Sequence, residues 1–434
     1  MTVQSSTSSI PNRWIQLVAG IVCTVMVANL QYGWTYFVDP IDAQHHWGRE
    51  AIQWGFTIFV ATATWLVPIE GWFVDRYGPR LIVAIGGVLV ALAWVINSYA
   101  QSLPMLYLGM ALSGIGNGAV WGTCIANALK WFPDRRGLAA GLTAMGYGGG
   151  AALTVVPIIK VIGAHGYEAA FFWFGLGQGC ILVVMSLFLV APPLSLTQNS
   201  DSASAVGGGA TPFEMLRTPI FWVIYLMFIT VAASGLIVTA QLGPILNDYK
   251  IANVAVDLVV LSSTVLVASA VVDNVLNGLA RPVFGWVSDH IGRENTMTIV
   301  FVLGAGAYWA LGSFGKDPYL FILTAGLIYF TWGEIYGLFP AVCTDFFGSR
   351  YAATNAGIVY TGKGIAAWLV PVASWLRDYS GGWYSVFIVA MIANLAVAAM
   401  AFFVLKPARK SQVAMAAKRH VALTSASSPG LHAS

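Results

Sequence analysis

Residues Val271–Arg293 read VVDNVLNGLARPVFGWVSDHIGR and join an apolar segment to a charged turn. The apolar segment continues a run that starts near Leu258, and it carries Asp273, Asn277 and Arg281 at intervals of four residues. On a helix, this spacing puts the three polar side chains in one stripe. The stretch therefore predicts a helix that carries a cation inside an apolar run and ends in a polar turn.

A repeat relates this stretch to the first half of the chain. Val67–Arg80 (VPIEGWFVDRYGPR) aligns with Arg281–Glu294 (RPVFGWVSDHIGRE) at an offset of 214 residues, and Pro, Gly, Trp, Asp and Gly coincide. Gly141–Gly148 (GLTAMGYG) aligns with Gly357–Gly364 (GIVYTGKG) at an offset of 216. Parallel repeats of this kind predict two related bundles around a central cleft.

The composition is that of a polytopic membrane protein. Of the 434 residues 58% are hydrophobic and 9% charged, whereas a soluble domain carries about 25% charged residues. Twelve apolar runs are long enough to cross a bilayer at about 20 residues each. We predict an all-α membrane fold of two six-helix bundles with spans at 14–38, 51–71, 81–100, 105–129, 138–162, 169–191, 219–243, 257–287, 296–314, 318–343, 352–375 and 383–406.

The spans divide the chain into five segments. We predict a cytoplasmic N-terminus (1–13), a first bundle (14–191), a Ser/Gly-rich cytoplasmic linker (192–218), a second bundle (219–406) and a cytoplasmic tail (407–434). Fourteen Lys and Arg residues then lie on the cytoplasmic side and five on the outer side. This bias places both termini in the cytoplasm. The first helix is expected to act as the insertion signal in the inner (plasma) membrane.

Several classes of function are excluded. Cys23, Cys124, Cys180 and Cys343 are scattered through apolar runs, and the six His residues lie in loops or the tail. This pattern fits neither a metal site nor a disulfide framework. The Gly-rich stretches lack the Gly-Lys-Ser/Thr ending of a phosphate loop. We therefore expect no enzyme activity, no metal, no cofactor and no nucleic-acid partner, and we expect a monomer in the lipid bilayer.

Two of the 21 basic residues fall inside predicted helices, Arg281 and Lys363. A charge in a membrane helix usually faces a water-filled path or a counter-charge. We interpret both as anion-binding residues beside a transport path. The alternatives are that Arg281 extends to the interface or pairs with Asp273, and that Lys363 pairs with Asp273 or Glu334.

Two loop motifs carry a family resemblance. Gly71–Arg80 (GWFVDRYGPR) and its echo at Gly285–Arg293 resemble the loops of the major facilitator superfamily, with Pro79 where that family often has a basic residue. The chain from Asn12 to Lys406 is further similar to the oxalate/formate antiporter family. The segments that carry this likeness are Asn12–Trp14, Gln31–Tyr32, Trp131–Asp134, Met215–Pro219, Arg281–Pro282 and Phe330–Gly333.

The resemblance implies a site. In that family an arginine on helix 8 and a lysine on helix 11 flank the substrate, and Arg281 and Lys363 match them. It implies a secondary transporter that exchanges oxalate for formate, with small carboxylate anions as partners. The remaining residues that we assign to the site on this basis are Gln31, Tyr32, Tyr147, Trp332, Tyr336, Trp121 and Tyr360; the last two have exchanged Tyr and Trp relative to the family.

The polar ends of the repeated segments are predicted to latch the two bundles on the cytoplasmic side. Asp75, Arg76, Asp289 and Arg293 are the candidate gate residues. In such a latch, the carboxylates accept from helix N-termini or arginines in one conformational state only. The alternative is that these charges only determine topology.

Two acids depart from the family pattern. Asp273 stands where the family has an uncharged amide, and Glu334 where it has a small residue. An ionised acid near the cations would lower the charge of the site and favour a monocarboxylate. A protonatable acid would permit proton coupling. A proton-coupled monocarboxylate transporter is therefore the alternative function.

Overall fold

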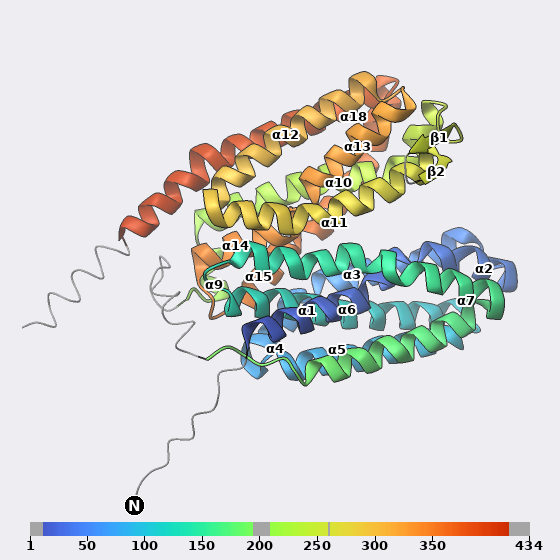
Figure 1. The fold of residues 1–434 in the computed structure, drawn as a ribbon, viewed down its shortest axis with the longest axis horizontal. Helices are drawn as coiled ribbons and strands as arrows, with labels where there is room; N and C mark the ends of the chain where they lie inside the picture. Colours follow the sequence, from blue (N-terminus) through green and yellow to red (C-terminus); the bar gives the residue numbers. More distant parts are fainter. Residues whose placement is uncertain (1–11, 194–208, 259–260, 416–434) are drawn as a thin grey trace, which may run out of the picture.

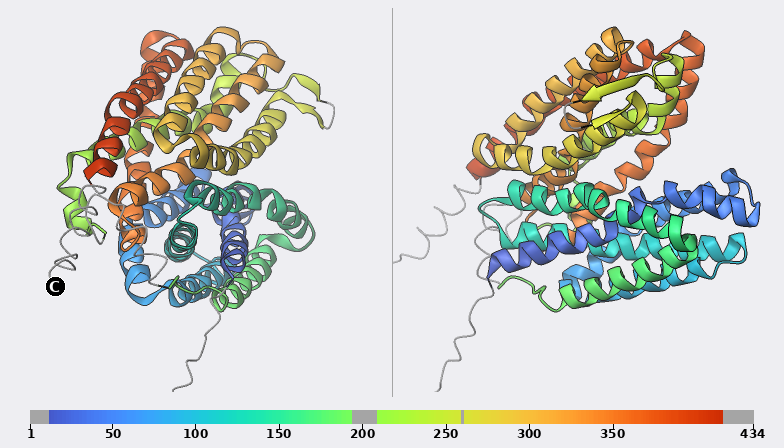
Figure 2. Two further views of the ribbon diagram at one scale, coloured as in Figure 1. Left: turned by 60° about the vertical axis from the view of Figure 1, so that its left-hand side comes forward. Right: turned by 45° about the vertical axis from the view of Figure 1, so that its right-hand side comes forward.

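The computed structural model describes residues 12–193, 209–258 and 261–415. Its helices form two bundles stacked as two layers (Figures 1 and 2). The first bundle consists of α1 (Arg13–Tyr32), α2 (Thr35–His45), α3 (Arg49–Trp65), α4 (Val67–Tyr77), α5 (Pro79–Ser98), α6 (Leu103–Trp131) and α7 (Arg136–Ser186).

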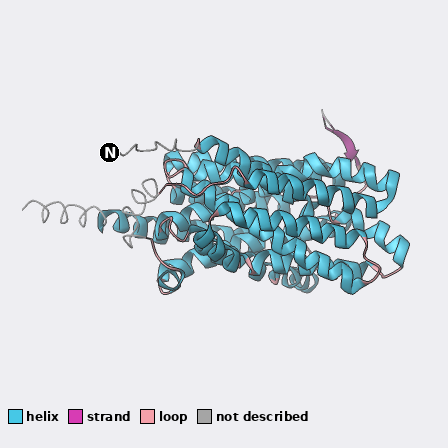
Figure 3. Cartoon of the chain, turned by 90° about the horizontal axis from the view of Figure 1, so that it is seen from below, coloured by secondary structure: helices cyan, strands magenta, loops and turns pink. Residues whose placement is uncertain are grey.

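The second bundle follows after the short helix α9 (Pro212–Leu216). Its elements are α10 (Pro219–Asp248), β1 (Ala255–Leu258), β2 (Leu261–Thr264), α11 (Val265–Ile291), α12 (Arg293–Phe314), α13 (Pro318–Gly333), α14 (Ile335–Phe347), α15 (Ala352–Tyr360), α16 (Gly362–Ala367), α17 (Leu369–Ser380), α18 (Trp383–Met400) and the π-helix η1 (Ala401–Leu405). Figure 3 shows these helices running along one common axis, with the strands at one end.

Nine helices in the described ranges are long and apolar enough to cross a membrane, and ten if the bent pair α3 and α4 counts as one span. The pair bends by 44° beside Pro68, because proline removes a backbone donor and clashes with the preceding turn. The helix α7 holds two predicted spans, which meet at Gly166 with a φ of 86°. The first part of α7 and the whole of α11 are the two further predicted spans, and both are helical.

The predicted start of the eighth span at residue 257 is wrong. The segment Ala255–Leu258 pairs antiparallel with Leu261–Thr264, and the helix starts at Val265. This run is rich in Val, Ser and Thr. Side chains branched at Cβ favour strands over helices. An apolar run of this length does not distinguish the two structures.

The predicted linker contains one ordered turn of helix at its end. Thr211 caps α9 by accepting from the backbone N–H of Glu214, and the Glu214 carboxylate accepts from the backbone N–H of Thr211. These two bonds form a capping box. The backbone N–H and the hydroxyl of Thr211 both donate to the Glu214 carboxylate, and they hold the pKa of this carboxyl below its usual range. The segments 1–11, 194–208 and 416–434, which hold most of the predicted N-terminus, linker and tail, lie outside the described residues.

The two bundles share one buried core at the end where α4 and α14 finish. We call this the basic end, because Arg80, Lys130, Arg136 and Arg293 lie there, and the opposite end the hairpin end. A single cluster of buried apolar side chains includes residues of both bundles. In Figure 1 the bundles touch at the basic end and spread apart toward α2 and the strands. The contacts that hold the halves together therefore gather at the basic end.

Candidate functional site

The two membrane cations lie on the faces of the second bundle that meet the first. Arg281 of α11 is 2% exposed and Lys363 of α16 is 8% exposed. The Nη1 atom of Arg281 donates to the carbonyl oxygen of Ala144 in α7 at 2.6 Å, and Nη2 donates to Oδ1 of Asn277 at 2.8 Å. Arg281 thus bonds to the opposite bundle and does not extend to the membrane–water interface.

The ring of Tyr336 joins the two cations. Cζ of Arg281 lies 5.1 Å from the centroid of this ring, and Nζ of Lys363 lies 5.4 Å from it. Nζ of Lys363 also donates to the hydroxyl of Tyr360 at 3.2 Å. An aromatic face attracts a cation through its quadrupole. The ring therefore holds two positive charges close together without neutralising either of them.

Neither cation pairs with an acid among the described residues. Asp273 and Glu334 are each 1% exposed, and both carboxylate oxygens of each lack a hydrogen-bond partner in the described part of the chain. Both alternatives that placed an acid beside Arg281 or Lys363 are thus wrong for this conformation. No carboxylate in the described part of the chain therefore pairs with either cation.

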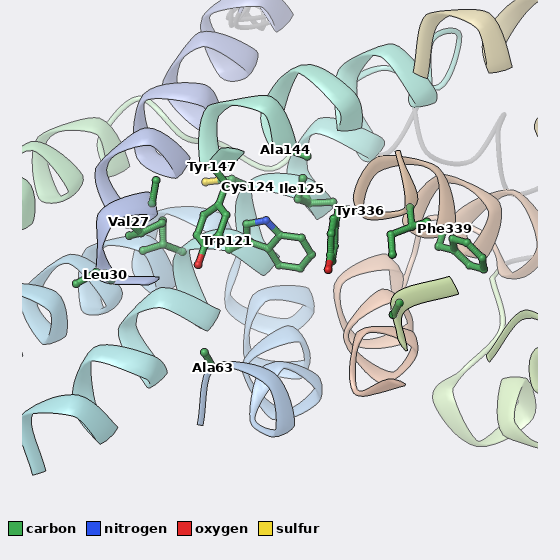
Figure 4. Close-up of a cluster of buried hydrophobic side chains, with 14 of the residues drawn as sticks. Val27, Leu30, Ala63, Trp121, Cys124, Ile125, Ala144, Tyr147, Tyr336 and Phe339 are labelled. Carbon is green, nitrogen blue, oxygen red and sulfur yellow. The ribbon is translucent and has the colours of Figure 1, made fainter. Parts of the chain in front are cut away.

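Residues of the first bundle form the facing wall. The hydroxyl of Tyr147 donates to Oε1 of Gln31 at 2.9 Å, and the rings of Tyr147 and Tyr32 lie 5.6 Å apart. The rings of Trp121 of α6 and Tyr360 of α15 lie 4.3 Å apart, tilted by 32°. This contact carries the aromatic wall across the boundary between the bundles. Figure 4 shows Tyr147, Trp121 and Tyr336 within one buried cluster.

The indole of Trp332 supplies a free donor. Its ring lies 5.5 Å from that of Tyr336, and its Nε1 is buried without a partner in the described ranges. A Cβ on Gly235 of α10 would lie 2.2 Å from this ring, so the glycine is needed to admit the indole. The structure therefore brings the seven other predicted site residues together around the two cations. Their roles in binding substrate stay predictions.

A seam of close backbone contacts runs from the basic end to Arg281. A Cβ on Gly285 of α11 would lie 2.2 Å from the carbonyl oxygen of Gly137 in α7. One on Gly141 would lie 2.2 Å from the carbonyl oxygen of Arg281. Small residues let helix backbones approach this closely. Farther along, a Cβ on Gly278 meets nothing nearer than 3.6 Å. The bond from Arg281 to Ala144 thus lies at the inner end of the seam.

The first latch joins Asp75 at the end of α4 to the start of α15 in the other bundle. Its carboxylate accepts from the backbone N–H groups of Ala353 at 3.4 Å and Thr354 at 2.9 Å, and from the Thr354 hydroxyl at 2.7 Å. Lys130 donates to the same carboxylate at 2.7 Å. The free N–H groups and the positive dipole of a helix N-terminus favour a carboxylate there.

The second latch repeats the first with the bundles exchanged. Asp289 of α11 accepts from the backbone N–H groups of Gly137 at 3.0 Å and Leu138 at 2.8 Å, at the start of α7. Arg293 binds Asp289 from the side. The offset from Asp75 to Asp289 is 214, the value found in the sequence repeat. Both latches therefore follow from the internal duplication.

One ion pair that we did not predict crosses the same boundary. Nη1 of Arg136 binds the carboxylate of Asp345, which also accepts from Nε of Arg293 at 3.2 Å. Asp345 lies 215 residues after Lys130, so the two repeats carry opposite charges there. By contrast, Arg76 is exposed, and its guanidinium lies over the rings of Trp72 and Tyr77. The structure does not bring Arg76 into the latches.

Comparisons with known proteins agree with this architecture. The family model of the major facilitator superfamily matches residues 17–371 and 274–431. The oxalate:formate antiporter of Oxalobacter formigenes is 33% identical over 405 residues, which cover 92% of this chain and 93% of that protein. This chain belongs to the oxalate/formate antiporter family of the major facilitator superfamily. It is therefore a multi-pass membrane transporter.

Two further matches to this transporter are more distant in sequence. Monocarboxylate transporter 13 of Rattus norvegicus is 24% identical over 391 residues, covering 87% of this chain and 85% of that protein. The solved structure of the proton:xylose symporter XylE superposes with a TM-score of 0.68 at 11% identity, covering 90% of this chain and 94% of that one. The structural match shows that the two chains share the two-bundle fold.

Two groups of this site were missed by reasoning from the sequence. The Ala144 carbonyl carries no signal, because every residue has a carbonyl and only packing decides which one meets Arg281. Asp345 does have a signal, since it lies in the last turn of the apolar helix α14 and aligns with Lys130 in the repeat. Extending the alignment of the halves by one segment would have found it.

Proposed function

We propose that this transporter exchanges oxalate for formate by alternating access across the inner membrane, with both termini in the cytoplasm and a monomer as the working unit. The observation that carries the proposal is the pair Arg281 and Lys363, both buried beside the Tyr336 ring without an acid partner in the described ranges. The identity of the relative from Oxalobacter formigenes supports the choice of anions.

The charges explain why the cargo is a small dicarboxylate. A planar guanidinium matches a carboxylate through two parallel N–H donors, whereas an ammonium acts as a point charge. Arg281 and Lys363 supply one of each. Oxalate neutralises both cations, and formate neutralises one. The free Nε1 of Trp332 is a further donor for a carboxylate oxygen.

The same charges explain exchange. Moving an empty site through an occluded state takes water from two like charges in a medium of low dielectric constant. A bound anion removes that cost. The barrier to switching is therefore low for the loaded carrier and high for the empty one. A cargo that binds the intermediate better than the resting states lowers the barrier in this way.

The test is counterflow in proteoliposomes. Vesicles are loaded with formate, the membrane potential is set with potassium and valinomycin, and entry of labelled oxalate is followed. One oxalate entering for one formate leaving moves one net negative charge inward, so an inside-positive potential should accelerate uptake. The driving force is about 2.3 kcal/mol per 100 mV. Equal uptake into empty vesicles, or uptake indifferent to the potential, would rule out the proposal.

The buried acids favour a second candidate, proton-coupled transport of a monocarboxylate. Asp273 lies two helical turns from Arg281 on the same face of α11, and Glu334 lies at the break between α13 and α14. Both have unpartnered oxygens in the described structure. This candidate predicts that an acidic exterior drives labelled formate into empty vesicles. It also predicts that Asp273→Asn or Glu334→Gln abolishes the effect of the pH gradient while leaving counterflow intact.

A further inference from the structure

The C-terminal end of α14 is completed by residues that are remote in the sequence. The last four carbonyl groups of a helix have no partner within it. In α14 these belong to Thr344, Asp345, Phe346 and Phe347. The Thr344 carbonyl accepts from the backbone N–H of Gly348 at 2.9 Å. The Phe347 carbonyl accepts from Ala210 N, next to α9, at 2.7 Å.

The two carbonyls between them are bound by side chains of the helical segment that follows η1. Nη1 of Arg409 donates to the Asp345 carbonyl at 2.6 Å, and Nε2 of Gln412 donates to the Phe346 carbonyl at 2.8 Å. Arg409 also donates to Oε1 of Gln412 at 3.0 Å. We call these two side chains the tail clamp. Gln412 is 5% exposed, so the clamp is packed against the bundle.

Local structure brings the clamp into place. Residues Ala401–Leu405 form a π-helix, and helical structure then continues to Met415. A π-helical turn inserts an extra residue and changes the direction in which later side chains point. Leu405 is fully buried, which anchors the turn. The guanidinium of Arg409 lies 5.5 Å from the Phe346 ring. Backbone, core and ring contacts thus aim Arg409 at the end of α14.

The residue held by this clamp carries the ion pair between the bundles. The Asp345 carboxylate binds Arg136 of α7, while its backbone carbonyl binds Arg409. We propose that Arg409 and Gln412 are positioning residues of the gate, which hold Asp345 where it can bind Arg136 and so favour closure of the basic end. This proposal rests on the alternating access proposed above, but it holds whatever anion is carried.

The measurement is the distance between spin labels on the two bundles, in the full chain without added anion. Arg135→Cys and Ile291→Cys place labels on exposed residues of the two bundles at the basic end, and Cys180→Ser removes the exposed native cysteine. Electron–electron double resonance then gives the fractions of closed and open molecules. Because the assay contains no cargo, its outcome is independent of whether oxalate and formate are the substrates.

In the clamp variants Arg409→Ala and Gln412→Glu, the ratio of open to closed molecules should rise by about five- to tenfold, as expected for one charge-assisted or buried hydrogen bond. Arg409→Lys keeps a charged donor and should restore most of the closed fraction. Lys410→Ala is the matched control, because Lys410 is exposed on the same helix. The Gln412→Glu variant replaces only the donor atom Nε2 by an oxygen, so it tests the proposal if the Arg409→Ala variant does not fold.

Two outcomes would overturn the proposal. One is an unchanged ratio in both clamp variants, which would mean that Asp345 is held without the tail. The other is an equal rise in Lys410→Ala, which would indicate a general effect of the tail's charge. Failure of oxalate/formate counterflow with a normal response in the spin-label assay would contradict the proposed cargo and leave the clamp standing.

Discussion

The guanidinium of Arg281 in the second bundle donates to the carbonyl oxygen of Ala144 in the first, across 2.6 Å. A residue that we assign to the anion is therefore also a bond between the two halves. The bond lies at the inner end of the α7–α11 seam. An arriving carboxylate offers the guanidinium another acceptor, so the bundles can separate at the basic end without leaving a buried cation unpaired.

Replacement of Arg281 should weaken oxalate binding strongly. Arg281→Lys keeps the charge but loses the planar fork, and we expect the affinity for oxalate to fall tenfold or more. The measurement is the concentration of unlabelled oxalate that halves labelled oxalate uptake. Wild-type uptake by Arg281→Ala would show that the residue is not in the binding site.

Replacement of Lys363 should separate dianions from monoanions. Lys363→Gln leaves one cation, which is enough for formate but not for both carboxylates of oxalate. We expect formate/formate counterflow to persist while oxalate/formate exchange is lost. Lys160→Gln is the control, because that lysine is exposed in the first bundle. Oxalate exchange at the wild-type rate in Lys363→Gln would contradict the assignment of the second cation.

The hydroxyl of Tyr360 should matter through Lys363. It accepts from Nζ at 3.2 Å, and its ring contacts that of Trp121. Tyr360→Phe keeps the ring contact and removes the acceptor. We expect a loss of a few fold in oxalate affinity, in keeping with a hydrogen bond to a charged group. Tyr360→Trp, which gives the residue type found in the family, tests whether ring shape decides anion preference. An unchanged affinity in Tyr360→Phe would mean that Lys363 is held by other contacts.

Loss of the Asp75 carboxylate should destabilise the closed basic end. Asp75→Asn removes the charge that binds Lys130 and the start of α15, which we expect to cost about 1–3 kcal/mol of the closed state. The rate of exchange should change at unchanged oxalate affinity. Asp134→Asn serves as the control, because Asp134 is exposed at the same end and pairs with Arg13. If Asp75→Asn exchanges at the wild-type rate, the charge sets topology only.

The fold and most of the site could be predicted from the sequence for two physical reasons. Apolar runs of about 20 residues have few solutions in a bilayer other than helices. The repeat then fixes equivalent positions, so Asp75 predicts Asp289. Buried cations are rare enough that Arg281 and Lys363 stand out without structural information.

The rest depended on tertiary packing. The hairpin before α11 looked like part of a helix, because a short continuous apolar run does not distinguish a strand from a helix. The acceptor for Arg281 is a backbone group of α7, and no side chain marks it. Arg409 and Gln412 read as part of a polar tail, since only the π-helical turn directs them toward α14. In each case the missing information is the direction in which one helix meets another.

The reciprocal latches also bear on how the protein is made. Asp75 is synthesised in the first half but completes a helix of the second, and Asp289 completes a helix of the first. While only the first half has left the ribosome, the first amide groups of α7 lack the Asp289 carboxylate that accepts from them in the complete protein. The first bundle therefore reaches its final hydrogen bonding only after α11 has entered the membrane. Biogenesis ends in a docking step in which each half supplies what the other lacks.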